Sequence, residues 1–212
     1  MGDNRIPPVA SAGPDEVIDC DTPSVVLEGA ASGGDGSAGY AYSWAPATGL
    51  SDPNVARPTC TAPGTYTLTV TDLANACAAS DTVIVTEDRR APAASAGPDK
   101  VLDCDTPSVV LEGAASGGNG SAGYAYAWSP PNGLSNPALA QPTCTQARTY
   151  TLTVTDLANG CTATDTVTVT RDVAAPTASA GADKTLDCDT ASVTLDGSAS
   201  GGNGSAGYSY SW

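Results

Sequence analysis

The residues of this chain with the most distinctive covalent chemistry are its seven cysteines. They recur at a spacing of 84 positions, as Cys20, Cys60 and Cys77, then Cys104, Cys144 and Cys161, then Cys188. The chain has no histidine, which removes the commonest general base and the commonest zinc ligand. We therefore expect disulfides or buried thiols rather than catalysis. We predict no catalytic, cofactor-binding or metal-binding residue and no enzymatic activity.

The cysteine spacing belongs to an internal repeat of the whole sequence. Aligning residues 9–92 with residues 93–176 without a gap gives 62 identical positions out of 84. An 84-residue unit lies in the size range of a single domain. The repeat predicts a leader or linker at 1–8, one domain in each aligned range, and a truncated third copy at 177–212. Because this third copy stops inside an expected strand, we expect the chain to be a piece of a longer protein.

Short strands separated by turn residues make up each repeat. In Thr65–Thr71, the apolar residues Tyr66, Leu68 and Val70 alternate with threonines, which is the period of a half-buried strand. No 11-residue window has a helical apolar stripe, and clusters of Gly, Pro, Asn and Asp separate the strands. Further strands are expected at Val17–Asp19, Val25–Leu27, Tyr40–Trp44, Val55–Thr61 and Thr82–Thr86. About seven strands at this spacing predict an all-β fold of tandem immunoglobulin-like β-sandwiches.

Tryptophan and tyrosine have to fill the core, because the chain has no phenylalanine. Trp44 and Tyr42 on the third strand and Tyr66 on a later strand lie in phase with apolar neighbours, and we predict that they are core residues. Tyr40 is the expected exposed ring. The rival interpretation is that the tyrosines form an exposed binding platform.

The charge of the chain is strongly acidic, with 23 acidic and 8 basic side chains and a net charge of −15. Binding to nucleic acid or to an anionic membrane needs basic residues, so neither is an expected partner. We interpret the acidic residues as a solvated, self-repelling surface. The alternative is calcium at the domain junctions, where Asp19 and Asp21, or Glu87 and Asp88, cluster. No Asp-x-Asp-x-Asp-Gly loop accompanies them.

Three motifs of the first repeat resemble a known family. Ala-Ser-Ala-Gly-Pro-Asp occupies residues 10–15, Tyr42-x-Trp44 lies in the middle, and Gly-Thr-Tyr-Thr-Leu-Thr-Val-Thr-Asp occupies residues 64–72. Together they resemble the polycystic-kidney-disease (PKD) and related immunoglobulin-like repeats of large secreted or cell-surface bacterial proteins, including gliding-motility adhesins and type IX-secreted proteins. PKD repeats usually continue after Tyr-x-Trp with an acidic, glycine-rich turn, whereas residues 45–50 here read Ala-Pro-Ala-Thr-Gly-Leu. The chain is therefore PKD-like, and the resemblance covers all of it.

Three pairings of Cys20 are open, because three cysteines cannot all pair within one domain. The resemblance to PKD-like repeats favours Cys20–Cys77. The sandwich topology favours Cys20–Cys60, since both are expected at one end of the domain and a disulfide needs Cα atoms within about 7 Å. The third pairing joins two repeats, because the lower end of one domain abuts the upper end of the next and brings Cys20 towards Cys161. The same question applies to Cys104 and Cys144.

These observations predict a structural stalk, spacer or adhesive array of a large extracellular bacterial surface protein, with neighbouring repeats of the same chain as partners. The alternative is a carbohydrate-binding accessory module that uses the glycine-rich loop Ser32–Gly39 with Tyr40, or Tyr124 in the second repeat. Surface polysaccharide or another cell-surface protein would then be the partner. Residues Met1–Pro8 have neither a basic nor an apolar signal region, so the export signal and the anchor are expected outside this chain.

Overall fold

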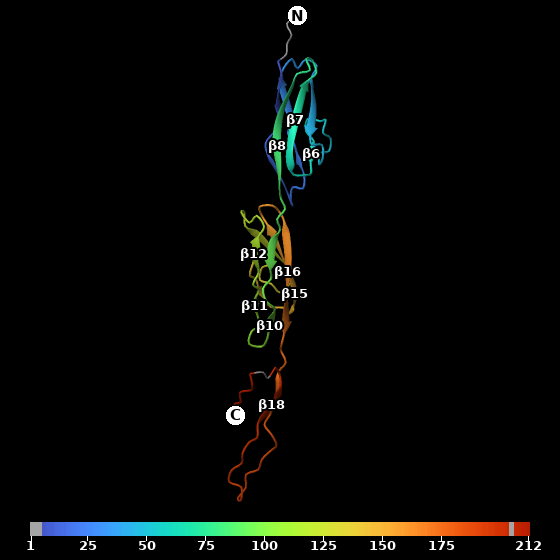
Figure 1. Ribbon diagram of the computed structural model, residues 1–212. Helices are drawn as coiled ribbons and strands as arrows, with labels where there is room; N and C mark the ends of the chain where they lie inside the picture. The colour runs from blue at the N-terminus through green and yellow to red at the C-terminus, as the bar shows by residue number, and fades with distance from the viewer. Residues whose placement is uncertain (1–5, 204–205) are drawn as a thin grey trace. The chain divides into compact units, whose positions relative to one another are not determined.

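The computed structural model describes residues 6–203 and 206–212 (Figure 1), so the first five residues of the expected leader lie outside the described residues. The chain divides into two compact units. Unit 1 consists of Met1–Ala94, Ala115–Ala125 and Thr153–Thr164, and it therefore joins the first repeat to two segments of the second. Unit 2 consists of Ser95–Ala114, Tyr126–Leu152 and Asp165–Trp212.

A four-stranded sheet in the order β2-β8-β7-β5 forms one layer of the first repeat. Its strands are β2 (Glu16–Asp19), β5 (Tyr40–Ala45), β7 (Gly64–Asp72) and β8 (Ala78–Asp88). Strands β7 and β8 pair antiparallel along their length, and Figure 1 shows them side by side. Strand β2 runs parallel to β8, with Asp19 opposite Asp88. The end of β2 and the end of β8 therefore reach the same edge of the domain.

Two short ladders complete the first repeat. Strand β1 (Pro8–Ser11) pairs antiparallel with β4 (Ala30–Gly33), and β3 (Val25–Val26) pairs antiparallel with β6 (Thr59–Cys60). The described residues contain strands and turns and no helix, as an all-β fold of tandem immunoglobulin-like sandwiches requires.

The second repeat has the same arrangement, with a four-stranded sheet in the order β10-β16-β15-β13. Its two short ladders are β9 with β12 and β11 with β14. The strand bounds are β9 Pro92–Ser95, β10 Lys100–Leu102, β11 Val109–Val110, β12 Ala114–Gly117, β13 Tyr124–Ser129, β14 Thr143–Cys144, β15 Arg148–Asp156 and β16 Thr162–Arg171. Each strand lies 84 positions after its counterpart, to within one residue at a few ends.

Residues 176–212 contain one antiparallel ladder, β17 (Pro176–Ser179) with β18 (Ser198–Gly201). None of the described residues in this range is buried, and the side chain of Trp212 is 72% exposed. Trp44 and Trp128, at the equivalent positions, are 2% and 3% exposed. The segment thus has the first ladder of a repeat without a closed core.

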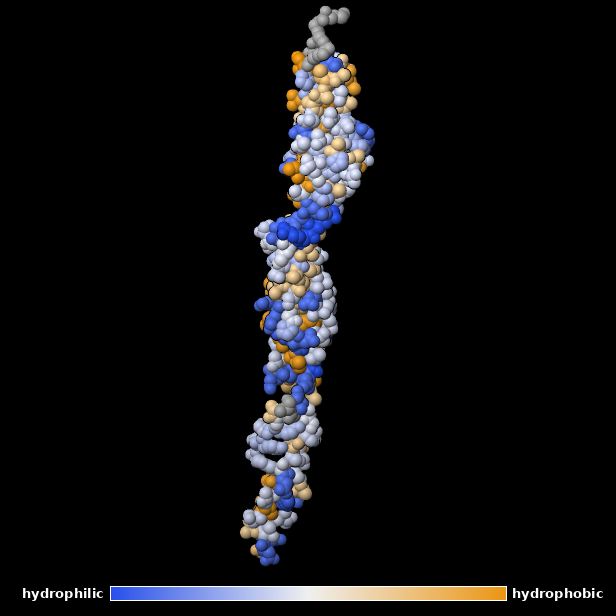
Figure 2. All heavy atoms as spheres, viewed as in Figure 1, coloured by the Kyte–Doolittle hydropathy of each residue, from blue (hydrophilic) through white to orange (hydrophobic). Residues whose placement is uncertain are grey.

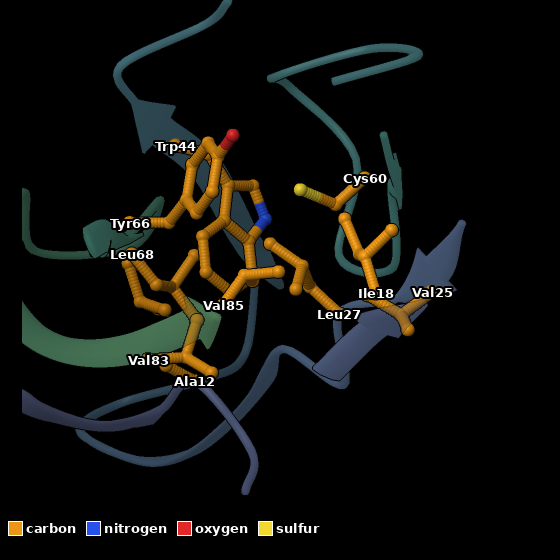
Figure 3. Packing of buried hydrophobic residues seen from close by; sticks show 11 residues of the cluster. Ala12, Ile18, Val25, Leu27, Trp44, Cys60, Tyr66, Leu68, Val83 and Val85 are labelled. Atoms are coloured by element: carbon orange, nitrogen blue, oxygen red, sulfur yellow. The ribbon is translucent and has the colours of Figure 1, made fainter. Parts of the chain in front are cut away.

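The core of the first repeat lies between the layers and is built around Trp44 and Tyr66 (Figure 3). Tyr66 donates its hydroxyl hydrogen to the Thr48 and Ala62 carbonyls, and burial raises its pKa to about 12. The indole N–H of Trp44 donates to the Val55 carbonyl at 3.0 Å. Both large rings therefore have partners for their polar atoms, as burial requires.

Most of the strand expectations are confirmed. Tyr66, Leu68 and Val70 are buried on one face of β7, as their alternation predicts. The expected strand at Val55–Thr61 is wrong over most of its length, because the backbone turns through it and only Thr59–Cys60 joins a ladder. Strands β1 and β4 are not predicted by the sequence pattern, because their small residues give no apolar alternation.

The two tyrosines of β5 have the same environment. Tyr40 and Tyr42 are both partly buried and pack against the core cluster, so the core prediction is confirmed in part for Tyr42, and the expectation of an exposed ring at Tyr40 is wrong. The visible surface is mostly hydrophilic or weakly polar with apolar residues scattered over it (Figure 2). Val9 and Ile84 are among the exposed apolar residues of the chain. Scattered apolar side chains of this kind are normal for a protein surface and do not mark a binding site.

Candidate functional site

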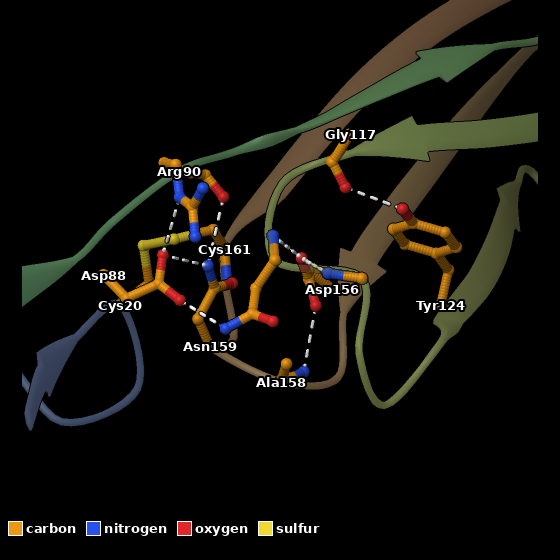
Figure 4. A network of polar contacts seen from close by, with 11 residues as sticks. Cys20, Asp88, Arg90, Gly117, Tyr124, Asp156, Ala158, Asn159 and Cys161 are labelled. Atoms are coloured by element: carbon orange, nitrogen blue, oxygen red, sulfur yellow. Dashed lines mark hydrogen bonds and ion pairs between the residues drawn. A yellow bond between two sulfur atoms is a disulfide. The ribbon is translucent and has the colours of Figure 1, made fainter.

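A disulfide joins Cys20 of the first repeat to Cys161 of the second, with a Cα–Cα distance of 5.1 Å and a sequence separation of 141 residues (Figure 4). Both cysteines belong to unit 1. Of the three open pairings, the bond between repeats is the one that the structure contains. The two pairings within a repeat, Cys20–Cys60 and Cys20–Cys77, are wrong, and each fails for a physical reason.

Cys77 lies too far from Cys20 because of the strand register. Cys20 directly follows β2, and Asp19 is opposite Asp88 at the end of β8. Cys77 precedes the first residue of β8, so 11 strand residues at about 3.3 Å each, roughly 35 Å, separate it from Cys20. A disulfide tolerates about 7 Å between Cα atoms.

Cys60 is unavailable to Cys20 because it belongs to the core. Cys60 is fully buried, and its sulfur points into the apolar cluster (Figure 3). The Cys60 thiol donates a hydrogen bond to the Ala62 carbonyl at 3.2 Å. Cys20 is exposed on the loop after β2. One sulfur therefore belongs to the core and the other to the surface, a difference that the expected strand topology does not contain.

A tight turn of sequence Asp-Cys-Asp-Thr presents Cys20. The Thr22 N–H donates to the Asp19 carboxylate at 2.6 Å, and the Asp19 N–H donates to the Thr22 carbonyl at 3.0 Å. Asp side chains favour such turns because they accept from nearby backbone N–H groups. The same two hydrogen bonds hold the turns at residues 103–106 and 187–190. All three turns therefore present a cysteine in the same local way.

Cys161 is presented by the junction loop, which we define as residues 156–161. The Cys161 N–H donates to the Asn159 side chain at 3.0 Å, and the Gly160 N–H donates to the Asp156 carbonyl at 2.8 Å. Gly160 has a φ of 68°, a left-handed conformation that is costly for residues with a Cβ. In the first repeat Ala76 occupies this position with a φ of 60°.

Hydrogen bonds from the junction loop to the first repeat surround the disulfide (Figure 4). The Cys20 N–H donates to the Asn159 carbonyl at 3.0 Å. The Asn159 side-chain amide donates to the Asp88 carboxylate at 3.3 Å and to the Arg90 carbonyl at 3.1 Å. Asn159 is 2% exposed, so these are buried polar contacts with a structural role.

Asp88 is the charged centre of this network. Its carboxylate accepts from the side-chain amides of Asn119 and Asn159 and from the Arg90 guanidinium. Hydrogen bonding, first from Asn119, holds the pKa of Asp88 below its ordinary value. Donors to a carboxylate favour the ionised form, so Asp88 remains an acceptor for both amides at neutral pH.

Buried Asp156 organises the loops next to this network. Burial by itself opposes its ionisation, but N–H groups of Ala158, Gly120 and Asn119 donate to the carboxylate and lower its pKa overall. Asp72 has the same role in the first repeat, where the N–H of Gly36 is the main cause of a lowered pKa. The glycine-rich loops are thus folded onto buried carboxylates.

The predicted carbohydrate platform has its polar groups engaged within the protein. The Tyr40 hydroxyl donates to the Gly33 carbonyl, and the Tyr124 hydroxyl donates to the Gly117 carbonyl at 2.6 Å. Each tyrosine therefore closes its own glycine-rich loop. These contacts give the two rings a structural role, and none of them favours the binding of a sugar.

Three carboxylates of the calcium alternative are likewise engaged in local contacts, whereas Asp21 is exposed. Asp19 caps its own turn, Glu87 pairs with Arg89 at 3.2 Å, and Asp88 accepts the amides described above. Within residues 6–203 and 206–212, no group of three or more His, Cys, Asp or Glu side chains is arranged to hold a metal ion. The described part of the chain also contains no helix with the length and hydropathy of a membrane span.

Comparisons with known proteins find curated relatives of the chain, although no family model matches it. The human dyslexia-associated protein KIAA0319 is 32% identical over 219 aligned residues, which cover 92% of this chain and 20% of that protein. The mouse KIAA0319-like protein is 32% identical over 169 residues, which cover 70% of this chain and 16% of that protein. The chain therefore spans a fifth or less of these relatives.

Among solved structures, immunoglobulin domains 1–5 of Sidekick-1 align with 93% of this chain and 46% of that one. The two are 12% identical, and the TM-score is 0.39.

Proposed function

We propose that this chain is a structural spacer within an extracellular or cell-surface protein, built from repeats that are covalently joined so that the array resists extension. The Cys20–Cys161 disulfide is the observation that carries the proposal. It links two domains instead of reinforcing one, and a single-domain binding module has no need of such a bond.

The disulfide also supports an extracellular location, because such bonds persist in oxidising compartments and are rare in the cytosol. The net charge of −15 suits an exposed array, since self-repulsion keeps long acidic molecules soluble. We propose alongside it an adhesive role, a bacterial source and a lack of catalytic activity. They rest on the resemblance to PKD-like repeats and on the absence of histidine from the sequence.

The disulfide changes how a pulling force passes along the chain. A force applied at the two termini enters Cys20, crosses the sulfur–sulfur bond and leaves through Cys161. Residues 21–160 lie inside the closed loop and cannot be stretched while the bond is intact. The cores of both repeats are therefore bypassed over most of their length, and the array keeps its extension even when a domain loses its fold.

Single-molecule force spectroscopy on the chain, tethered at its termini, tests this proposal. The disulfide spans a sequence separation of 141 residues, so reduction should release about 470–510 Å of additional contour length at 3.3–3.6 Å per residue. Cys20→Ser should behave like the reduced chain in the absence of reductant.

Cys188→Ser is the matched control, because Cys188 lies in the same type of turn and has no disulfide. It should behave like the oxidised parent. Equal contour lengths for the oxidised parent and Cys20→Ser would contradict the proposed spacer.

A further inference from the structure

A cavity of about 430 Å³ lies at the end of the second repeat, within unit 2. Its wall includes Cys104 with its neighbours Asp103 and Asp105, together with Asp172, Ala174 and Asn203. Cys104 is exposed and free. The cavity therefore combines a thiol with a carboxylate and a side-chain amide on one surface.

Each of these residues has a counterpart in the junction around Cys20. A shift of 84 positions places Cys104 on Cys20, Asp172 on Asp88 and Asn203 on Asn119. The Asn203 amide donates to the Asp172 carboxylate at 2.8 Å, just as the Asn119 amide donates to Asp88. The framework of the first junction is therefore reproduced at the end of the second repeat.

In the first junction, this framework holds the junction loop. Asn159 donates to the Asp88 carboxylate and to the Arg90 carbonyl, and it accepts from the N–H of Cys20. The corresponding groups at the cavity are the Asp172 carboxylate, the backbone of Ala174 and the turn of Cys104. A loop that carries asparagine two positions before cysteine has complementary chemistry for all three.

We propose that this cavity binds the Asp-Leu-Ala-Asn-Gly-Cys loop of a further repeat of the same kind, and that Cys104 forms a disulfide with the cysteine of that loop. The inference rests on the proposed function in one respect, since it extends the observed covalent junction to a second site. It makes the Cys20–Cys161 bond one member of a series in which each repeat is tied to the next.

The residue before the loop cysteine should determine how well the loop binds in the cavity. Gly160 has a φ of 68°, which is strained for a residue with a Cβ, and an added Cβ would also displace the Asp21 carboxylate, whose equivalent at the cavity is Asp105. The loop of the first repeat has Ala76 at this position. We therefore expect the cavity to prefer the glycine form of the loop to the alanine form.

Formation of the bond needs an oxidant, and a small-molecule disulfide such as oxidised glutathione is sufficient. The Cys104 thiolate attacks one glutathione sulfur, which forms a mixed disulfide and releases one glutathione thiol. The thiolate of the incoming loop then attacks the Cys104 sulfur and releases the second glutathione thiol. Two protein thiols lose two protons and two electrons, and one oxidised glutathione becomes two reduced molecules.

The test uses a cyclic peptide of Thr153–Thr164, closed by a D-Pro-Gly turn opposite the junction loop. In the first repeat the equivalent ends, Thr69 and Ser80, are directly paired, so the closure preserves the strand register. Preorganisation of this kind reduces the entropy lost on binding. The oxidised 212-residue chain is incubated with the peptide in a glutathione redox buffer, and the mixed disulfides are mapped by mass spectrometry.

Cys188 is the internal control, because it lies in the same Asp-Cys-Asp-Thr turn and is also exposed and free. Yields at both cysteines are divided by their glutathionylation in the absence of peptide. We expect at least a tenfold excess at Cys104 for the glycine peptide and a smaller excess for the same peptide with Gly160→Ala. The N159A peptide, and the chain variant Asp172→Ala with the parent peptide, should lose the excess.

Equal normalised yields at Cys104 and Cys188 for the glycine peptide would overturn the inference, as would an excess that survives N159A. The same digest reports the Cys20–Cys161 peptide. Its presence together with equal yields leaves the proposed spacer standing and rejects only the second junction. Its absence would contradict the proposed spacer itself.

Discussion

Two copies of the same turn differ in whether their cysteine forms a disulfide. The turns at residues 19–22 and 103–106 share the sequence Asp-Cys-Asp-Thr and the same pair of hydrogen bonds. Cys20 is bonded to Cys161, whereas Cys104 is free. What differs is the surrounding structure, since the junction loop packs against the first turn and a cavity lies beside the second. Local sequence therefore presents the thiol, and a neighbouring repeat decides whether it is bonded.

The largest expected difference between the cysteines is in their rates of reaction with a thiol-labelling reagent. In the native, unreduced chain we expect iodoacetamide to modify exposed Cys104 and Cys188 within minutes. Buried Cys60 and Cys144 should react orders of magnitude more slowly, because their sulfurs become accessible only when the core opens. Cys20 and Cys161 should be unreactive until a reductant is added. Labelling of Cys20 at the rate of Cys104 would show that the two turns are alike in solution.

Two equivalent tryptophans show a second difference, between the second repeat and residues 177–212. Trp128 is 3% exposed in the second repeat, and Trp212 occupies the equivalent position at 72% exposure. We expect Trp128→Ala to cost about 3–5 kcal/mol of unfolding free energy, through the lost burial and the cavity left behind. Trp212→Ala should change it by less than about 0.5 kcal/mol.

Urea unfolding followed by circular dichroism measures both tryptophan variants. Hydrogen exchange gives an independent check on the same contrast. Amides of Val193–Leu195 should exchange faster than those of Val109–Leu111, because a single two-stranded ladder without a partner sheet cannot offset its ordering entropy. Similar protection of the two segments, or a similar cost for the two substitutions, would remove the distinction between the second repeat and residues 177–212.

Acid should weaken the junction loop through Asp156. Its pKa is lowered in the folded protein, so the folded state binds fewer protons than the unfolded state as the carboxylate titrates. The stability it contributes is complete above the unfolded pKa of about 4 and is lost as the pH falls through the lowered folded value. Asp156→Asn should lower the melting temperature at pH 7 and should reduce the fall in melting temperature between pH 7 and pH 2.

The control for this pH effect is Asp183→Asn, which changes an exposed carboxylate outside both cores. It should keep the melting profile of the parent over the same pH range. A profile for Asp156→Asn that runs parallel to the parent profile would show that this carboxylate does not carry the acid sensitivity.

The smallest expected effect is the difference in stability between the glycine form and the alanine form of the loop. Gly160→Ala should destabilise the junction by about 1 kcal/mol, because alanine is strained at positive φ. The exposed Asp21 carboxylate can rotate away from the added methyl group, so the overlap adds little. Ala76→Gly is the reciprocal variant and should shift stability by a similar amount in the opposite sense. Thermal unfolding measures both, and equal shifts of the same sign would refute the conformational explanation.

Much of the fold could be predicted from the sequence, because its signals are local or periodic. The 84-residue repeat, the alternation of Tyr66, Leu68 and Val70, and the lack of phenylalanine indicate tandem sandwiches with Trp44 and Tyr66 in the core. Small residues in β1 and β4 carry no such signal, so these strands appear only when the backbone ladders are seen.

The partner of Cys20 belongs to the tertiary structure. From the sequence, three cysteines were candidates for it, and the expected topology favoured Cys60, which lies in the same domain. The actual partner is 141 residues away, and it is reached because parallel pairing of β2 with β8 brings Cys20 to the end of the first repeat, where the junction loop of the second repeat docks. A disulfide forms where two sulfurs can approach in space, and no local pattern in the sequence encodes that distance.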